Sequence, residues 1–325
     1  MFIGDHMILV TGEALFDLFV SADQGTSFAF DARPGGSSFN VAIGLARLGQ
    51  PAAFLGGLST DFLGQRLEHL LAEEGVLRQF IQHPPRPTTL SVIGLGPGGV
   101  PAYAFYGNGA DQEVTLAAIP GLPAAIRALH LSSFSTVIEP VGATLEALVA
   151  RESGQRLIAY DPNIRPTIVP DMEIWRRKFR RLLPLTHLLK ISLEDFHLLF
   201  PGAEPAALAR GWIAEGPKLV VVTRGAEGAM GWTAAAEVEL PAMPTVLVDT
   251  VGAGDTFQAA LLAGLAETGH LDPRALESLT APSLVELLSF AGKAAAITCS
   301  RRGADMPRRA ELPALSSTLH GRAVS

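Results

Sequence analysis

The sequence predicts an α/β fold with a doubly wound, mostly parallel sheet and a small β-sheet lid. Apolar runs typical of buried strands alternate with stretches of helical periodicity over most of the 325 residues. Repeated strand–helix alternation favours parallel strands covered by helices on both faces. Hydrophobic residues make up 48% and charged residues 18% of the chain, so a chain of this length can bury a core. Two segments break the alternation, and they predict the lid.

The main-sheet strands are expected, in chain order, at residues 8–11, 52–58, 128–131, 156–160, 188–191 and 218–223. A first helix is expected to begin at a cap from Ser37 or Ser38 and to end at Gly49, where glycine can adopt the left-handed conformation. Further helices are expected at 61–75 and 256–265. The residues expected on the buried faces of the first two helices are Phe39, Ala42, Ile43, Ala46 and Leu48, then Phe62, Leu63, Leu67, Leu70 and Leu71.

Residues 15–30 and 88–106 carry the alternation of half-buried strands, but no helical pattern follows either segment. We expect them to project from the main sheet as a lid, with insertions at about residues 13–33 and 88–112 of a single domain that spans 1–325. Exposed sheet edges can pair with a second copy of a chain. A homodimer formed through the lid is therefore an open expectation.

Charge and composition narrow the partners and the location. The net charge of −7 at pH 7 provides no basic field that would collect nucleic acid. One cysteine, Cys299, can form neither an intrachain disulfide nor a thiolate zinc site, which is typical of a reducing compartment. The sequence has no run of about 20 apolar residues, and its first nine residues lack the features of a signal peptide. We expect a cytoplasmic protein that binds neither nucleic acid nor membrane.

The most informative stretch is Asp-Thr-Val-Gly-Ala-Gly-Asp, from Asp249 to Asp255, which leads into the helix at 256–265. Gly252 and Gly254 leave the backbone bare where N–H groups and the helix dipole converge, and this favours a bound anion. The carboxylate of Asp255 would repel a phosphate unless it had a chemical role. It can accept the proton of a hydroxyl that attacks a phosphoryl group held by the N–H groups. The same pattern also fits an ordinary loop with an acidic first helical turn.

This stretch resembles, without a break, the C-terminal signature D-T-x-G-A-G-D of the ribokinase-like (PfkB) carbohydrate kinases. The family's N-terminal signature is matched by Gly35-Gly36-Ser-Ser-Phe-Asn40 and the helix up to Gly49. Further similar blocks are Gly12-Glu-Ala-Leu-Phe-Asp17, Asp161-Pro-Asn-Ile-Arg165, Lys190-Ile-Ser-Leu-Glu-Asp195, Val222-Thr-Arg-Gly-Ala-Glu-Gly228 and Thr298-Cys-Ser-Arg-Arg-Gly-Ala304. The resemblance runs from about Ile8 to Pro307. The blocks that begin at Asp161, Lys190 and Thr298 look most like the fructokinase branch of the family.

The resemblance implies ATP-dependent phosphorylation of a sugar hydroxyl, with fructose as the first expectation for the acceptor. It implies Asp255 as the base, with an anion hole from Gly252, Ala253 and Gly254. The implied sugar site is Asp17, Gly35, Gly36, Asn40, Tyr106, Asn163 and Arg165, of which the last two could also face the ATP phosphates. The implied ATP site is Lys190, Ser192, Thr223, Gly225, Gly228, Gly252, Gly254 and Gly292. Either Asp195 or Glu194 is implied for Mg²⁺, through water, and Asp249 for a potassium ion.

Alternatives remain open at this point. 2-Keto-3-deoxygluconate kinase, ribokinase and nucleoside kinase belong to the same family. Gly107 stands where many relatives in the fructose and ketodeoxygluconate groups carry an arginine, and Gly292 stands where many carry an asparagine near adenine. A non-catalytic sugar-sensing module could keep the fold, but it would not need Asp255. The stretch Gly94–Gly99 matches the dinucleotide pattern G-x-G-x-x-G, but Pro101 and a strand pattern follow it, so we expect a hairpin turn rather than an oxidoreductase site.

Overall fold

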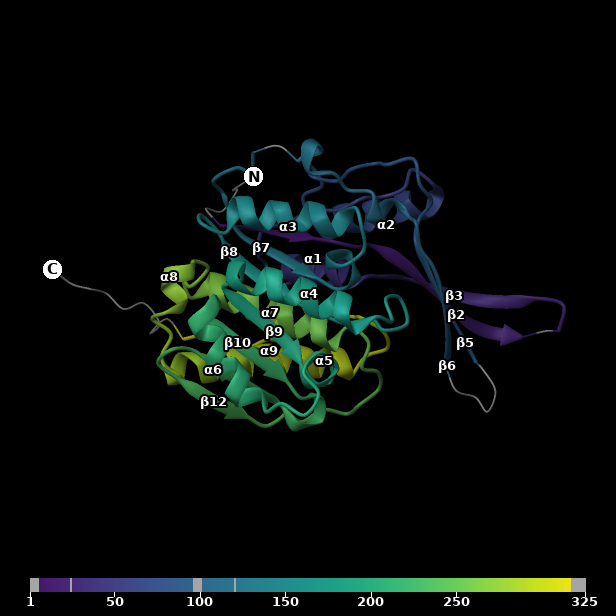
Figure 1. The fold of residues 1–325 in the computed structure, drawn as a ribbon. Coiled ribbons are helices and arrows are strands. Elements are labelled where there is room, and N and C mark those ends of the chain that lie inside the picture. Colours follow the sequence, from purple (N-terminus) through teal and green to yellow (C-terminus); the bar gives the residue numbers. More distant parts are fainter. Residues whose placement is uncertain (1–5, 24, 96–100, 120, 317–325) are drawn as a thin grey trace.

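A computed structural model describes residues 6–23, 25–95, 101–119 and 121–316. The strands are β1 (Met7–Thr11), β2 (Leu15–Asp23), β3 (Phe28–Gly35), β4 (Ala52–Leu55), β5 (Leu90–Leu95), β6 (Pro101–Tyr106), β7 (Ile126–Ser132), β8 (Leu157–Asp161), β9 (Leu188–Ser192), β10 (Leu219–Thr223), β11 (Ala229–Trp232) and β12 (Glu237–Leu240). The helices are α1 (Ser37–Arg47), α2 (Phe62–Glu73), α3 (Val141–Glu152), α4 (Met172–Leu182), α5 (Leu193–Leu199), α6 (Pro205–Glu215), α7 (Ala253–Glu267), α8 (Pro273–Leu276) and α9 (Ala281–Cys299). Figure 1 shows their arrangement.

Two sheets organise these elements. Within the described residues, the main sheet has eight strands in the order β12-β11-β10-β9-β8-β7-β1-β4. Its strands are parallel from β4 to β10, and β11 and β12 run antiparallel at one edge. The expected mostly parallel sheet is therefore confirmed.

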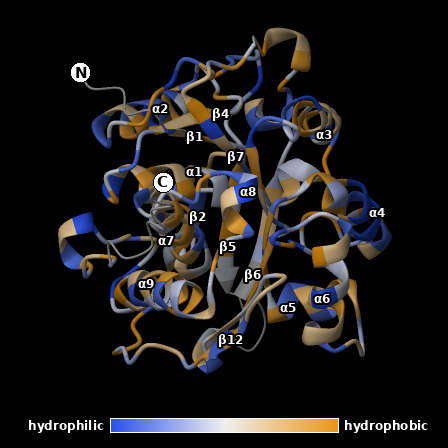
Figure 2. Cartoon of the chain, turned by 90° about the vertical axis from the view of Figure 1, so that its left-hand side faces the viewer, coloured by the Kyte–Doolittle hydropathy of each residue, from blue (hydrophilic) through white to orange (hydrophobic). Residues whose placement is uncertain are grey.

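Each central strand faces two hydrophobic cores, because successive side chains of a strand point to opposite faces. In β1, Ile8 and Val10 pack in the core that contains α1, α7 and α9, whereas Met7 and Leu9 pack in the core that contains α3 to α6. Figure 2 shows these two groups of helices on opposite sides of the main sheet. This layering explains why the strand sequences are apolar throughout rather than alternating.

In the part of the chain that the structure describes, four strands form a separate small sheet in the order β3-β2-β5-β6. This sheet projects from the side of the main sheet (Figure 1). Its outer pairs, β2–β3 and β5–β6, are antiparallel, and its central pair, β2–β5, is parallel. The expected second sheet is thus present. The turn expected at Gly94–Gly99 lies mostly outside the described residues, but the two strands that flank it pair as a hairpin would. No helix in the described part of the chain is both long and apolar enough to cross a membrane.

Three local expectations were wrong. The N-cap of α1 is Gly36, not a serine, because the hydroxyls of Ser37 and Ser38 donate elsewhere, to Asp255 and to the carbonyl of Thr11. Phe62 is 78% exposed, because it is the first residue of α2 and lies beyond the part of the helix that packs through Leu67 and Leu71. The strand expected at 52–58 ends earlier, at residue 55.

The end of α1 was predicted correctly. Gly49 has a φ of +78°, and its N–H donates to the carbonyl of Ala46 at 2.9 Å. A residue with a side chain would be strained in this left-handed conformation, so glycine is favoured at this position.

Candidate active site

A cleft of about 920 Å³ lies at the carboxyl ends of the parallel strands, where open α/β sheets bind their ligands. Residues that end or closely follow the strands β7 to β10 line one wall: Ser133, Asn163, Ser192 and Thr223. The small sheet forms the other wall through Asp17, Phe19, Ser91, Ile93, Tyr103 and Phe105. The N-terminal ends of α1 and α7 complete the cleft with Gly36, Ser37, Asn40, Gly252, Gly254 and Asp255.

Asp255 lies in the first turn of α7, where its buried carboxylate is held by two donors from α1. The hydroxyl of Ser37 donates to Oδ1 at 2.7 Å, and Nδ2 of Asn40 donates to Oδ2 at 2.8 Å. Burial raises the pKa of Asp255, and the hydrogen bonds from Asn40 and Ser37 oppose that rise. The carboxylate is thus oriented and shielded from bulk water, as a general base should be.

The backbone at the start of α7 has the geometry of a candidate anion site. Gly252 caps the helix in a left-handed conformation, with φ +76°. Within the described residues, the N–H groups of Gly252, Gly254 and Asp255 donate no hydrogen bond, whereas that of Ala253 donates to the carbonyl of Thr250 at 3.2 Å. Free N–H groups at a helix N-terminus bind anions such as phosphate. Ala253 therefore contributes less to this anion site than its two glycine neighbours.

Steric space at this turn is limited. A Cβ on Gly254 would lie 3.3 Å from Nζ of Lys190, and a Cβ on Gly252 would lie 2.5 Å from Cβ of Ala304. Both glycines therefore keep the backbone accessible to a ligand.

A buried ion pair stands next to this turn. Nζ of Lys190, on β9, donates to Oδ2 of Asp161, at the end of β8, over 2.7 Å. The two residues are 2% and 1% exposed. Oδ1 of Asp161 and Oδ1 of Asn163 have no hydrogen-bond partner among the described residues. Buried polar atoms are rarely left unpaired, so these two oxygens are available to a ligand, a metal ion or its water.

The two candidate metal residues differ in burial. Asp195 is buried, and burial together with the nearby charge of Asp161 raises its pKa to about 6. Its Oδ1 accepts the N–H of Ile164 at 3.2 Å, and its own N–H donates to Oγ of Ser192 at 3.0 Å. Glu194 is exposed. Both residues line the cleft.

Asp17, on β2, faces the cleft from the small sheet. It stands opposite Arg33 of β3 and Ser91 of β5. Burial raises the pKa of Asp17, while a hydrogen bond with Ser91 and the charge of Arg165 lower it. Arg165 is exposed and lines the same cleft. A carboxylate in this position can accept hydrogen bonds from sugar hydroxyls.

Six predicted site residues do not line the cleft, and Ala253, the first residue of α7, is one of them. Gly35 lies beside it, since a Cβ there would meet Oδ2 of Asp17 at 2.4 Å. Tyr106 is exposed at the end of β6. Gly228 is a turn glycine with φ +98°. Gly292 lies on α9, where a Cβ would be 3.5 Å from Cγ of Met243.

Asp249 is the sixth predicted site residue outside the cleft lining. It accepts the N–H groups of Val251 at 3.1 Å and Gly303 at 2.8 Å. Burial raises the pKa of Asp249, but these hydrogen bonds outweigh the effect of burial and lower the pKa overall. Asp249 therefore ties the loop before α7 to the turn after α9.

Sequence reasoning missed several residues of the cleft. Glu13, Ser37, Thr250 and Arg224 line it, and each is adjacent in the chain to a predicted site residue or lies within a quoted motif. Tyr103 and Phe105, rather than Tyr106, are the aromatic residues of β6 that line it. Strand alternation could have indicated this, because residues 103 and 105 share a face and 106 points to the opposite one.

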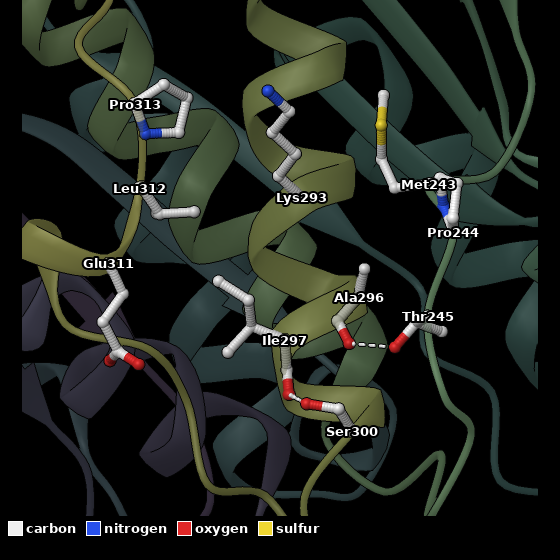
Figure 3. Close-up of a pocket in the computed structure, with 10 residues that line it drawn as sticks. All are labelled: Met243, Pro244, Thr245, Lys293, Ala296, Ile297, Ser300, Glu311, Leu312 and Pro313. Atoms are coloured by element: carbon white, nitrogen blue, oxygen red, sulfur yellow. Dashed lines mark hydrogen bonds between the residues drawn. The ribbon is translucent and has the colours of Figure 1, made fainter.

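A second hollow of about 370 Å³ lies over α9 and shares no lining residue with the cleft (Figure 3). Its lining residues are Met243, Pro244, Thr245, Lys293, Ala296, Ile297, Ser300, Glu311, Leu312 and Pro313. Two of its lining residues are joined by a hydrogen bond of 2.8 Å, which Thr245 donates to the carbonyl of Ala296. It contains none of the predicted site residues.

The fold and the cleft are those of a phosphotransferase that acts on small hydroxylated molecules, and comparison with known proteins specifies the family. Residues 5–310 match the pfkB family of carbohydrate kinases, and the chain belongs to this family.

Its relatives include a fructokinase from Rhizobium leguminosarum bv. trifolii, 39% identical over 86% of this chain and 85% of the relative. Fructokinase-1 from Oryza sativa subsp. japonica is 32% identical over 92% and 93% of the two chains. Among solved structures, a fructokinase with bound ATP from Xylella fastidiosa superposes with a TM-score of 0.84 at 27% identity, covering 96% of this chain and 97% of that one. The expected resemblance to the fructokinase branch is confirmed.

Proposed function

We propose that this protein is a fructokinase, which transfers the γ-phosphoryl group of ATP to fructose and yields fructose 6-phosphate. The observation that carries the proposal is the placement of a buried carboxylate, Asp255, directly beside free backbone N–H groups in a cleft that Asp17 also lines. The similarity to proteins named fructokinase, which covers most of this chain, supports fructose as the acceptor.

Asp255 would accept the proton of the attacking sugar hydroxyl. As the oxygen–phosphorus bond to the sugar forms, the bond to the β-phosphate oxygen of ATP breaks and ADP leaves. The N–H groups of Gly252 and Gly254 would stabilise the charge on the transferred group, and Lys190 would add a positive charge beside it. The sugar would be oriented by Asp17, Gly36 and Asn40.

The nucleotide would extend from this turn towards the end of β10. Ser192, Thr223 and Gly225 line that part of the cleft. Asn163 and Arg165 line it as well and would reach the phosphates. The base would lie beyond them, near Gly292 and the exposed apolar side chains of Val246 and Leu247.

We propose that Mg²⁺ accompanies ATP. The described residues contain no group of three or more His, Cys, Asp or Glu side chains that could hold a metal ion, so phosphate oxygens and water would provide most ligands. Asp195 or Glu194 would hold the water shell, and the unpaired oxygen of Asp161 fits the same role. When bound, the ion neutralises charge on the phosphates.

A potassium ion near Asp249 is a further proposal. The loop of Asp249 joins the anion site to the turn at Gly303, so an ion bound there would act on the geometry of α7. Activity measured with and without potassium in a sodium-free buffer tests it, and an unchanged rate would remove it.

The small sheet would act as a lid that excludes water and prevents ATP hydrolysis.

We also propose that two copies of the chain associate through the small sheet. Its edge strand β3 carries Phe28 and Phe30, which are 59% and 46% exposed. Light scattering of the wild type and of the Phe28→Ser and Phe30→Ser variants tests this association. A monomeric wild type would contradict the proposed dimer. We also propose a cytoplasmic location, which the single cysteine, Cys299, supports.

The test of the proposed function is turnover of MgATP across fructose, ribose, 2-keto-3-deoxygluconate, adenosine, inosine and fructose 6-phosphate. We expect kcat/KM for fructose to exceed the others by at least one order of magnitude. Dominance of another acceptor would transfer the assignment to that sugar or nucleoside. A sugar-induced thermal shift without any turnover would favour a non-catalytic sugar-binding module.

A further inference from the structure

The first turn of α1 lines the proposed sugar site, and one of its side chains also contacts the candidate base, Asp255. Oγ of Ser37 donates to Oδ1 of Asp255 at 2.7 Å across 218 positions of sequence. Both side chains are buried. The helix does not need this hydroxyl, because Gly36 is its N-cap and no side chain caps it. The hydroxyl of Ser37 is therefore committed to Asp255.

Ser37 is itself held from two sides. Its N–H donates to Oε1 of the buried Glu13 at 2.9 Å. Its Oγ accepts a hydrogen bond from Oγ of Ser132, at the end of β7, over 3.2 Å. A serine hydroxyl has one hydrogen to donate. Because Ser132 is the donor to Ser37, the hydroxyl hydrogen of Ser37 is directed at Asp255.

The other donor to the carboxylate has a second role in the proposed reaction. Asn40 donates to Oδ2 of Asp255 at 2.8 Å, but it also lines the sugar side of the cleft. If Asn40 turns to the sugar when the sugar binds, Ser37 becomes the side chain that still fixes the carboxylate. The two donors are thus not equivalent.

We propose that Ser37 is a positioning residue for the phosphoryl transfer, whose hydroxyl fixes the orientation of the Asp255 carboxylate while Glu13 anchors the Ser37 backbone. The inference rests on the proposed function, since it concerns the same base. A misoriented carboxylate accepts the proton less well, so kcat is affected more than sugar binding.

The pH dependence of activity distinguishes a positioning role of Ser37 from a packing role, because the charged groups around Asp255 stay in place when the Ser37 hydroxyl is removed. Glu13 precedes β2, Lys190 lies on β9 and Arg165 follows β8, and these three charged groups act on Asp255. Removing the Ser37 hydroxyl leaves them in place. The hydrogen bond from Ser37 lowers the pKa of Asp255, so its loss should move the acidic limb of activity to higher pH.

Ser37→Ala is the test, with Ser38→Ala as the matched control. Ser38 is the next residue in the same buried turn, but its hydroxyl donates to the carbonyl of Thr11 at 2.9 Å. For Ser37→Ala we expect kcat to fall about tenfold or more, as loss of a hydrogen bond to a charged group implies. The KM for fructose should change less than about threefold, and the acidic limb of the kcat–pH profile should rise by up to about one unit. Ser37→Thr, which keeps a hydroxyl, should recover most of kcat.

The inference is overturned if Ser37→Ala keeps the wild-type kcat and pH profile, or if Ser38→Ala causes the same loss with an unshifted acidic limb. Titration of the Asp255 carboxyl by ¹³C NMR in the free proteins separates this inference from the proposed function. A raised pKa in Ser37→Ala but not in Ser38→Ala supports the positioning role even if fructose is not the acceptor. Equal pKa values in all three proteins refute it whatever the acceptor.

Discussion

The two walls of the cleft are built differently. The wall that carries Asp255, Lys190 and Asp161 belongs to a sheet covered by helices on both faces, and all three side chains are buried. The opposite wall is a projecting sheet of four strands with several exposed aromatic side chains, among them Tyr103 at 61%. A buried wall holds charges in fixed positions, as phosphoryl transfer requires. An exposed wall can close over a ligand. Substitutions on the first wall should therefore act on kcat, and those on the second on KM.

The largest effect is expected from Asp255→Asn. An amide cannot accept the proton of the sugar hydroxyl, so kcat should fall by roughly 10²- to 10⁴-fold, the usual contribution of a general base. Stability should not suffer, because burial already disfavours the charged carboxylate. Steady-state kinetics and a fructose-induced thermal shift measure both properties. Turnover near that of the wild type would remove Asp255 from the role of base.

Gly254→Ala should come next. The added methyl group would approach Nζ of Lys190 to 3.3 Å without backbone strain. It would obstruct the anion site, so kcat should fall by about 10²-fold. Gly211→Ala is the control, because Gly211 lies within α6 with open space around it. The control should keep full activity and gain about 0.5–1 kcal/mol of stability. Equal activity of the two variants would argue against phosphoryl binding at this turn.

Asp17→Asn examines the other wall. A neutral amide accepts hydrogen bonds from sugar hydroxyls less strongly than a carboxylate. The KM for fructose should therefore rise by about tenfold or more, consistent with about 1.5–3 kcal/mol for a charged hydrogen bond. The KM for ATP should remain unchanged. A fall in kcat with an unchanged fructose KM would show that the two walls do not divide their roles in this way.

The smallest effect concerns the base of the small sheet. Asp111 follows β6, accepts a hydrogen bond from Thr89 just before β5, and is buried. Burial, with the nearby charge of Glu13, raises its pKa from 3.8 to about 7. A carboxyl group whose pKa is raised in the folded protein stabilises the folded state at pH values below its pKa in the unfolded chain. This stabilisation is lost as the pH rises towards 7.

In Asp111→Asn, the amide does not ionise, so the stability of the variant does not fall in this way as the pH rises. Relative to the wild type, the variant should gain about 1 kcal/mol of unfolding free energy between pH 6 and 7. Urea unfolding at the two pH values measures it. A pH-independent difference would mean that Asp111 does not titrate in this range.

The main sheet and the residues of the anion turn could be predicted because their signals are local. A strand is apolar where both faces are covered, and Asp249 to Asp255 is one continuous motif. The hydrogen bond between Ser37 and Asp255 could not be predicted, because it joins the first turns of two helices 218 positions apart. The same long-range contact explains the wrong cap at α1, because the hydroxyl of Ser37 donates to Asp255 instead of capping the helix.

Element ends and turn glycines were the least predictable parts of the site. Gly228 and Gly292 match a family motif or position, but the first shapes a turn against the carbonyl of Leu240 and the second lies beside Met243. Ala253 matches the motif as closely as its neighbours do, yet its N–H donates to the carbonyl of Thr250. A motif specifies which residues are near a ligand, but the direction of each N–H depends on backbone angles that the sequence does not state.

The central claim is transfer of a phosphoryl group from ATP to fructose, and ³¹P NMR of the products tests it most directly. With MgATP and fructose, the account predicts one ADP and one fructose 6-phosphate for each ATP consumed, with almost no inorganic phosphate. Release of inorganic phosphate independent of fructose, or unchanged ATP in the presence of fructose, would contradict it.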